Sequence, residues 1–168
     1  RLTGQWDPVR RECGLPFTPA ALERPGFAYD TEPACRAVVA VRMMEPEKAL
    51  AYLHRVQSAF HAEGHDVTSP AVLAELAEGL GLDRAAFLAR FGSDSARAET
   101  ALDFSTAREM GVTGFPTLAA GYPNKQFFLV TSGFATATTL AERLARLDAI
   151  AAQGRVPLPH ELAAIGND

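Results

Sequence analysis

The sequence predicts an α/β chain that is mostly helical and carries one β-hairpin and a final helix near its C-terminus. Capping residues and apolar positions spaced three or four apart recur through the first two thirds of the chain. Beyond residue 116 the apolar pattern changes to that of short strands, and one more amphipathic segment follows. At 168 residues the chain has the length of one ordinary domain.

Six helices are expected before residue 111, each opened by a capping residue or a proline. In chain order these starts are Asp7-Pro8, Asp30 or Thr31, Pro46, Ser69-Pro70, Asp83, and Ser93 or Asp94. The helix after Pro46 is predicted to bury one apolar face and to end at Gly64. That face consists of Leu50, Leu53, Val56 and Phe60.

Two short strands are expected at Thr117–Ala120 and Phe127–Thr131, joined by the turn residues 121–125. A final helix follows, closed by Gly154. Its inward face consists of Leu140, Leu144, Leu147 and Ile150. A two-stranded hairpin is not stable as a sheet by itself. We therefore expect it to lie on helices or to pair with further strands.

Composition excludes several classes of partner. The net charge is −4 and the pI is near 5.6, so the chain lacks the basic character expected of a nucleic-acid-binding protein. No apolar run reaches the ~20 residues of a membrane-spanning helix, so no membrane contact is expected. No signal-peptide pattern opens the chain, and we expect a cytoplasmic protein.

The cysteines and histidines predict neither a disulfide nor a metal site. Cys13 and Cys35 are too far apart in sequence for a Cys-x-x-Cys pair and lack zinc-site spacing, so we expect free thiols. His61 and His65 are four residues apart, but Gly64 interrupts the helix between them and no third ligand is near. Solvated histidines are the simpler interpretation.

The segment Gly114-Phe115-Pro116-Thr117 lies between a long helix and a strand, with proline at the first strand position. Here the chain resembles the thioredoxin superfamily, which places a cis-proline at this junction. The resemblance implies that the bend exposes the main chain of Phe115, and that an extended substrate pairs with it as an added strand. Gly114, Phe115, Pro116 and Thr117 are therefore the predicted substrate-binding residues. A plain proline at a strand start is the alternative.

A wider resemblance points to the DsbA-like family. It rests on the segment from Tyr29 to Ala37, the helical layout, the hairpin and the sequence Thr131-Ser132-Gly133-Phe134, and it extends from about Trp6 to Leu147. It implies a thioredoxin-like fold with a large helical insertion. Residues 1–110 would form the insertion, 111–153 the β-β-α portion of the thioredoxin fold, and 154–168 a tail.

The chain departs from this family at its start. The family opens with a strand, a Cys-x-x-Cys at a helix N-terminus and a second strand, and no residues before Trp6 supply them. We therefore expect no catalytic residue and no dithiol redox activity from the chain as written. Where that segment is supplied, the resemblance implies thiol–disulfide exchange with protein or peptide thiols.

Two other functions stay open. The first is a glutathione-dependent isomerase or transferase, similar to the kappa-class transferases and the chromene-carboxylate isomerases. Such an enzyme would use glutathione as a cofactor, whereas thiol–disulfide exchange needs no cofactor. The second is a non-catalytic binding protein. In the resembling fold the strand Thr117–Ala120 pairs with a first strand, and without that strand its open edge predicts a homo-oligomer.

Cys35 is a candidate reactive thiol. It lies in the first turns of a helix capped by Asp30 or Thr31, where the helix dipole could lower its pKa. Free cysteines are also among the most buried residue types, and an inert core cysteine is the favoured interpretation.

Overall fold

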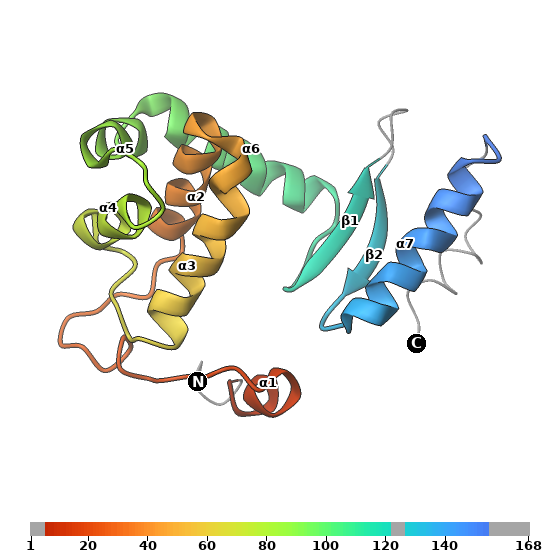
Figure 1. The fold of residues 1–168 in the computed structure, drawn as a ribbon, viewed down its shortest axis with the longest axis horizontal. Helices are drawn as coiled ribbons and strands as arrows, with labels where there is room; N and C mark the ends of the chain where they lie inside the picture. Colours follow the sequence, from red (N-terminus) through yellow and green to blue (C-terminus); the bar gives the residue numbers. More distant parts are fainter. Residues whose placement is uncertain (1–5, 122–126, 155–168) are drawn as a thin grey trace. The chain divides into compact units, whose positions relative to one another are not determined.

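The computed structural model describes residues 6–121 and 127–154, and these divide into two compact units. Residues 1–103 belong to the first, helical unit and residues 104–168 to the second. The division falls inside helix α6 (Asp94–Glu109), whereas the sequence placed the end of the helical portion at residue 110. The helix is continuous across it, so the two units share an element (Figure 1). The expected tail, apart from Gly154, lies outside the described residues.

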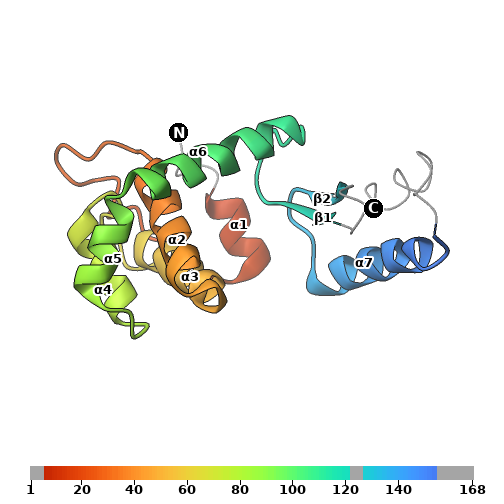
Figure 2. The ribbon, with the colours of Figure 1, turned by 90° about the horizontal axis from the view of Figure 1, so that it is seen from above.

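The helical unit packs short helices around α2. Its elements are α1 (Trp6–Cys13), α2 (Glu32–Met44), the 3₁₀ turn η2 (Pro46–Lys48), α3 (Ala49–His61), α4 (Pro70–Glu78), α5 (Arg84–Phe91) and the first part of α6. Helix α2 contacts α3, α4 and α5, and α4 contacts both α3 and α5. Figure 2 shows α2 and α3 side by side. Every helix start predicted from the sequence lies at or within a few residues of an observed one.

The helix starts follow their local chemistry. The Asp83 side chain accepts a hydrogen bond from the Ala86 amide, as an N-cap should, and Ser93 Oγ does the same for the Ala96 amide. Before α2 it is Asp30 Oδ1 that accepts from the Glu32 amide. The expected cap at Asp7 is wrong, because α1 begins one residue earlier and Asp7 lies in its first turn.

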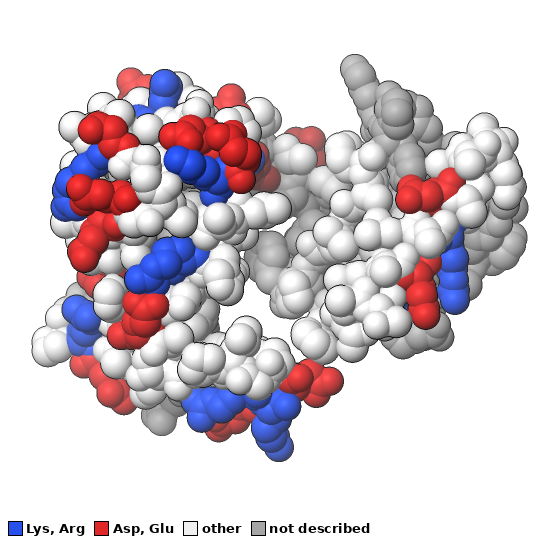
Figure 3. All heavy atoms as spheres, viewed as in Figure 1, with Lys and Arg blue, Asp and Glu red and all other residues white. Residues whose placement is uncertain are grey.

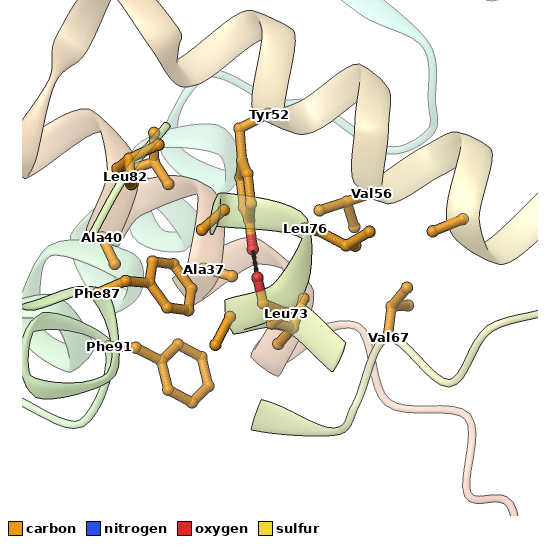
Figure 4. Packing of buried hydrophobic residues seen from close by; sticks show 14 of the residues in the cluster. Ala37, Ala40, Tyr52, Val56, Val67, Leu73, Leu76, Leu82, Phe87 and Phe91 are labelled. Atoms are coloured by element: carbon orange, nitrogen blue, oxygen red, sulfur yellow. Dashed lines mark hydrogen bonds between the residues drawn. The ribbon is translucent and has the colours of Figure 1, made fainter. Parts of the chain in front are cut away.

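The core of the helical unit is centred on Tyr52, which is fully buried. Its hydroxyl donates a hydrogen bond of 2.8 Å to the carbonyl oxygen of Leu73 and so joins α3 to α4 (Figure 4). The predicted inward face of α3 needs correction at two positions, because Leu50 is 79% and Leu53 36% exposed. A tyrosine can occupy the centre of that face only because its hydroxyl finds a partner there.

The second unit holds the hairpin and the last helix. Strand β1 (Thr117–Gly121) pairs antiparallel with β2 (Phe127–Ser132), with an irregular register between Leu118 and Ala119. Helix α7 (Ala137–Ala151) begins at the predicted region, where Thr136 Oγ1 accepts from the Thr139 amide. Of the predicted turn 121–125, all but Gly121 lies outside the described residues.

Helix α7 buries one face of this hairpin. Val130 from β2 and Leu147 from α7 are fully buried, and partly buried residues surround them: Ala120, Phe128, Leu140 and Leu144. Arg143 is also buried, and its Nη1 donates to the carbonyl oxygen of Val130 at 3.1 Å. The predicted inward face of the last helix is therefore confirmed at Leu147 and Ile150, both buried. The hairpin lies on a helix, as its marginal stability requires.

Charges of both signs are mixed over the surface of the helical unit. Figure 3 shows lysine and arginine next to aspartate and glutamate on the visible face of that unit. Exposed ion pairs contribute to this mixing, among them Arg42 with Asp103 and Arg55 with Glu63. None of the described helices combines the length and the apolar character that a membrane crossing would need.

Candidate functional site

The loop between α6 and β1 contains the predicted substrate-binding residues, Gly114 to Thr117. Helix α6 ends where Gly111 adopts a positive φ of +73°, which a residue with a side chain rarely does. The peptide bond between Phe115 and Pro116 is cis, as the resemblance implies, and β1 begins at the next residue, Thr117. The proline therefore stands directly before the strand, where its missing N–H removes no ladder bond.

Two hydrogen bonds hold this loop. Thr117 Oγ1 donates to the carbonyl oxygen of Gly114 at 2.7 Å and closes the loop on itself. The Gly133 amide donates to the carbonyl oxygen of Pro116 at 2.8 Å and ties the loop to the end of β2. Gly133 has a φ of +103°, a conformation that glycine adopts at little steric cost because it has no Cβ. The main chain can therefore turn at Gly133 towards Pro116.

Phe115 is the residue that this loop presents to solvent. Its side chain is 87% exposed, more than any other large hydrophobic residue that the structure describes. Among the described residues, neither its N–H nor its C=O has a hydrogen-bond partner. A large apolar side chain and two free main-chain groups at one position can bind an extended polypeptide through its backbone and one side chain.

The edge of β1 offers further main-chain groups. In the part of the chain that the structure describes, β2 is the only strand paired with β1. The outer edge of β1, which follows directly after Pro116, therefore has the hydrogen-bonding groups to which an added strand would pair.

Cys35 lies on α2 and is half-buried and free. Burial raises the pKa of the Cys35 thiol, and the carboxylates of Glu32, Asp103 and Asp30 raise it further. The raised pKa is opposite in direction to the alternative of a reactive thiol and agrees with the favoured interpretation of an inert cysteine. Desolvation and negative neighbours both disfavour the thiolate. At neutral pH the residue is a thiol, which is the weakly reactive form.

The other candidate residues do not form a second site. Cys13 is the last residue of α1 and is also a free, half-buried thiol. No group of three or more histidine, cysteine or acidic side chains within residues 6–121 and 127–154 could hold a metal ion. His65 is half-buried and its Nε2 lies 3.9 Å from a Glu63 carboxylate oxygen.

The structure reveals a cavity that the sequence did not predict. It lies in the helical unit and has a volume of about 210 Å³. Its walls come from α2, α3 and the segments before α2 and after α3, and include Tyr29, Cys35, Phe60 and His61. The one signal for this cavity in the sequence was the pair of aromatic residues Phe27 and Tyr29. They precede the helix, so their apolar side chains do not belong to the buried face of a helix.

Comparison with known proteins places these features in a family. The thioredoxin family model matches residues 27–126. A solved structure from Nitrosomonas europaea, provisionally described as a protein disulfide isomerase, is 36% identical with a TM-score of 0.83, and the match covers 88% of this chain and 72% of that one.

The cytosolic disulfide reductase DsbM of Pseudomonas aeruginosa is also similar. Its structure with GSH is 26% identical with a TM-score of 0.62 over 88% of this chain and 72% of that one. A second structure of it, also 26% identical, has a TM-score of 0.64 over 89% and 73%. A search of the curated proteins found no match. On the family model, the identity to the Nitrosomonas protein and the fold, this chain belongs to the DsbA-like thioredoxin-fold family.

Proposed function

We propose that this chain provides the substrate-binding part of a DsbA-like thiol–disulfide exchange site. The loop Gly114–Thr117 holds an extended polypeptide that carries a thiol or disulfide, and the main chain of Phe115 pairs with it as an added strand. The observation that carries the proposal is Phe115 itself, 87% exposed and with both main-chain groups unpaired among the described residues.

The chemistry assigns the redox step to thiols other than the two in this sequence. In thiol–disulfide exchange a thiolate attacks one sulfur of a disulfide and expels the other sulfur as a thiolate. A mixed disulfide forms, and a second thiol must resolve it. Cys13 and Cys35 are 22 positions apart in sequence, and the pKa of Cys35 is raised. We infer that the 168-residue chain does not turn over dithiol substrates by itself.

The relatives support the class of partner. One is described as a disulfide isomerase and another as a cytosolic disulfide reductase, and both descriptions name proteins that act on disulfides. Protein or peptide thiols are therefore the partners that we propose, in the cytoplasm.

Backbone NMR with a peptide tests the binding step. The probe is an unstructured peptide with one S-methylated cysteine, which cannot undergo exchange. We expect its addition to shift the amide signals of Phe115 and Thr117. Phe115→Ala should weaken binding by about tenfold because an aromatic contact is lost. Thr117→Val should weaken it by about two- to tenfold because the hydrogen bond to Gly114 is lost.

Phe127→Ala is the matched control, because Phe127 is 59% exposed but lies on β2 outside the loop. Equal losses in the control and in Phe115→Ala would contradict the proposal, as would shifts confined to the helical unit. An insulin-reduction assay tests the redox step separately. Sustained turnover by the chain alone would refute the inference that it lacks dithiol activity.

Glutathione is the second candidate partner, since the DsbM structure was solved with GSH. In this reading the chain contributes to a glutathione-dependent isomerase or transferase, and glutathione takes the place of the polypeptide at the loop. Calorimetric titration with glutathione distinguishes the two. Binding that shifts the Phe115 amide favours this second candidate. The absence of both heat and an amide shift up to about 10 mM, roughly ten times a weak Kd of 1 mM, would exclude it.

The outer edge of β1, which pairs with no other strand among the described residues, gives the third candidate, a non-catalytic homo-oligomer. We propose that two copies associate through Thr117–Ala120 when no substrate occupies the edge. Light scattering of the chain should then show a concentration-dependent rise above the monomer mass. Leu118→Lys places a charge on this edge and should restore the monomer, because a charged side chain on an edge strand opposes pairing with another strand. A monomer at all concentrations would contradict the proposal.

A further inference from the structure

Strand β2 contains a β-bulge close to the Phe115 loop. The bulge lies at Val130, which opposes no residue of β1, because its neighbours Leu129 and Thr131 pair with two consecutive residues of β1. The carbonyl oxygen of Val130 accepts a hydrogen bond of 3.1 Å from the buried Arg143 of α7. A bulge changes the direction of the side chains near it, and bulges are frequent beside functional sites.

The bulge turns the side chain of Thr131 towards the interior. Neighbouring residues of a regular strand point to opposite faces of the sheet, yet Val130 and Thr131 are both buried. A buried hydroxyl needs a partner within the protein. Oγ1 of Thr131 donates a hydrogen bond of 3.2 Å to the carbonyl oxygen of Gly133, just beyond the end of β2.

The carbonyl oxygen of Gly133 needs this donor because its opposite residue is a proline. Beyond the pair Thr117 and Ser132, the next residues that face each other are Pro116 and Gly133, and the Gly133 amide donates to the carbonyl oxygen of Pro116. Two residues of a hydrogen-bonded antiparallel pair normally exchange both of their N–H···O bonds. Proline has no N–H and cannot return the second bond. The hydroxyl of Thr131 therefore supplies the donor that Pro116 lacks.

We propose that Thr131 is a positioning residue of the binding site at the Phe115 loop. Its hydroxyl fixes the carbonyl group of Gly133, and so fixes the turn whose amide holds Pro116. Phe115 directly precedes Pro116, so the direction of its main-chain groups depends on where Pro116 is held. This inference rests on the proposed binding of an extended polypeptide at the loop, and it identifies what keeps the loop in its binding geometry.

Two substitutions of Thr131 and one control isolate the hydroxyl. Thr131→Val keeps the shape of the side chain and removes the donor, whereas Thr131→Ser keeps the donor and should restore the properties of the parent chain. Thr100→Val is the matched control, because Thr100 is also buried and its hydroxyl donates to the carbonyl oxygen of Ala96 at 2.7 Å, but in the helical unit. Circular dichroism checks that each variant is folded.

Hydrogen exchange of the Gly133 amide, followed by NMR in the free chain, tests the positioning without any ligand. This amide should exchange about two- to tenfold faster in Thr131→Val, the factor expected from the loss of one hydrogen bond. In Thr131→Ser and Thr100→Val its rate should stay within about twofold of the parent rate, well below that of a lost bond. The amide of Leu147, inside α7, should keep the parent rate in all variants, because only a general loosening of the unit would change it.

The S-methylated peptide then tests the consequence for binding. Thr131→Val should weaken binding by about two- to tenfold, while Thr131→Ser and Thr100→Val should bind about as well as the parent chain. Binding by the parent chain and equal binding by Thr131→Val would overturn the positioning role and leave the proposed function intact. Where the parent chain itself fails to bind, the proposed function fails, and the exchange rate of the Gly133 amide still decides whether the hydroxyl holds the turn.

A double variant tests whether Thr131 acts through Gly133. Gly133 has room for a Cβ, since no atom lies within 4 Å of that position, but its φ of +103° disfavours any side chain. Gly133→Ala should therefore disturb the turn through its main chain alone. When it is combined with Thr131→Val, the loss of peptide affinity should be smaller than the product of the two single losses. A full product, a Gly133 exchange rate in Thr131→Val equal to the parent rate, or an equal acceleration at Leu147 would overturn the proposal.

Discussion

The hydroxyl of Tyr52 makes a contribution to stability that one substitution isolates. Tyr52→Phe removes a single oxygen atom from a fully buried side chain and leaves the ring between α3, α4 and α5. The ring keeps its contact with Phe87, whose centroid lies 5.8 Å away. The change therefore removes the hydrogen bond to the carbonyl oxygen of Leu73 and little else.

The cost follows from the geometry of that bond. At 2.8 Å between neutral groups, we expect a loss of about 1 kcal/mol, within the usual range of roughly 0.5–1.5 kcal/mol. Leu73 lies inside α4, where its carbonyl oxygen also accepts an intrahelical bond, so that oxygen is not left wholly unpaired. For a unit of about this size, 1 kcal/mol corresponds to a fall in Tm of about 4–8 °C.

Urea unfolding followed by far-ultraviolet circular dichroism measures this free energy. Tyr29→Phe is the matched control, because Tyr29 is 51% exposed and its hydroxyl has no partner among the described residues. It should change the free energy of unfolding by less than about 0.5 kcal/mol. A Tyr52→Phe variant as stable as the parent chain would refute the reasoning, and so would an equal loss in both variants.

Other side chains give further predictions. Arg36→Met should lower the free energy of unfolding by about 2–4 kcal/mol, because it breaks a partly buried ion pair with Glu32, a buried hydrogen bond to the carbonyl oxygen of Phe91 and a contact with the Phe91 ring. Arg42→Met breaks an exposed pair and should cost about 0–1 kcal/mol in the same urea assay, and equal costs would contradict this. The folded pKa of His61 is lowered, so the unfolded chain binds a proton more readily, and stability should fall as pH drops through about 6.5. Urea titrations at several pH values should show a smaller loss of stability in His61→Gln than in the parent chain. His54→Gln is the control, because His54 is exposed, and it should lose as much stability as the parent chain. An equal loss in the parent chain and both variants would exclude His61 as the cause.

Much of the fold was readable because it depends on local chemistry. Asp83 caps α5 through its own side chain, and the hairpin strands start at the predicted residues Thr117 and Phe127. The family was readable for a related reason, since the motif around Phe115 and Pro116 is short and contiguous. Such features need only a few neighbouring residues, so a linear sequence contains them in full.

The less accurate predictions concern side chains whose partners lie far away in the chain. The apolar spacing of α3 favoured Leu50 as an inward residue, but the helix is rotated so that Tyr52 is buried against Leu73 of α4. The sequence favoured an inert Cys35 over a reactive one, but the direction of its pKa depends on burial and on a contribution from Asp103 on α6, which the sequence did not predict. Both outcomes depend on contacts between helices.

By itself the sequence determined the helical order, the hairpin, the family and the loop at Phe115, because caps, periodicity and turn residues act over a few positions. Only the tertiary structure decided which faces are buried, how the Cys35 thiol is tuned and where the cavity between α2 and α3 lies. These properties come from the packing of segments distant in sequence, and packing is a matter of shape and desolvation that no local pattern records.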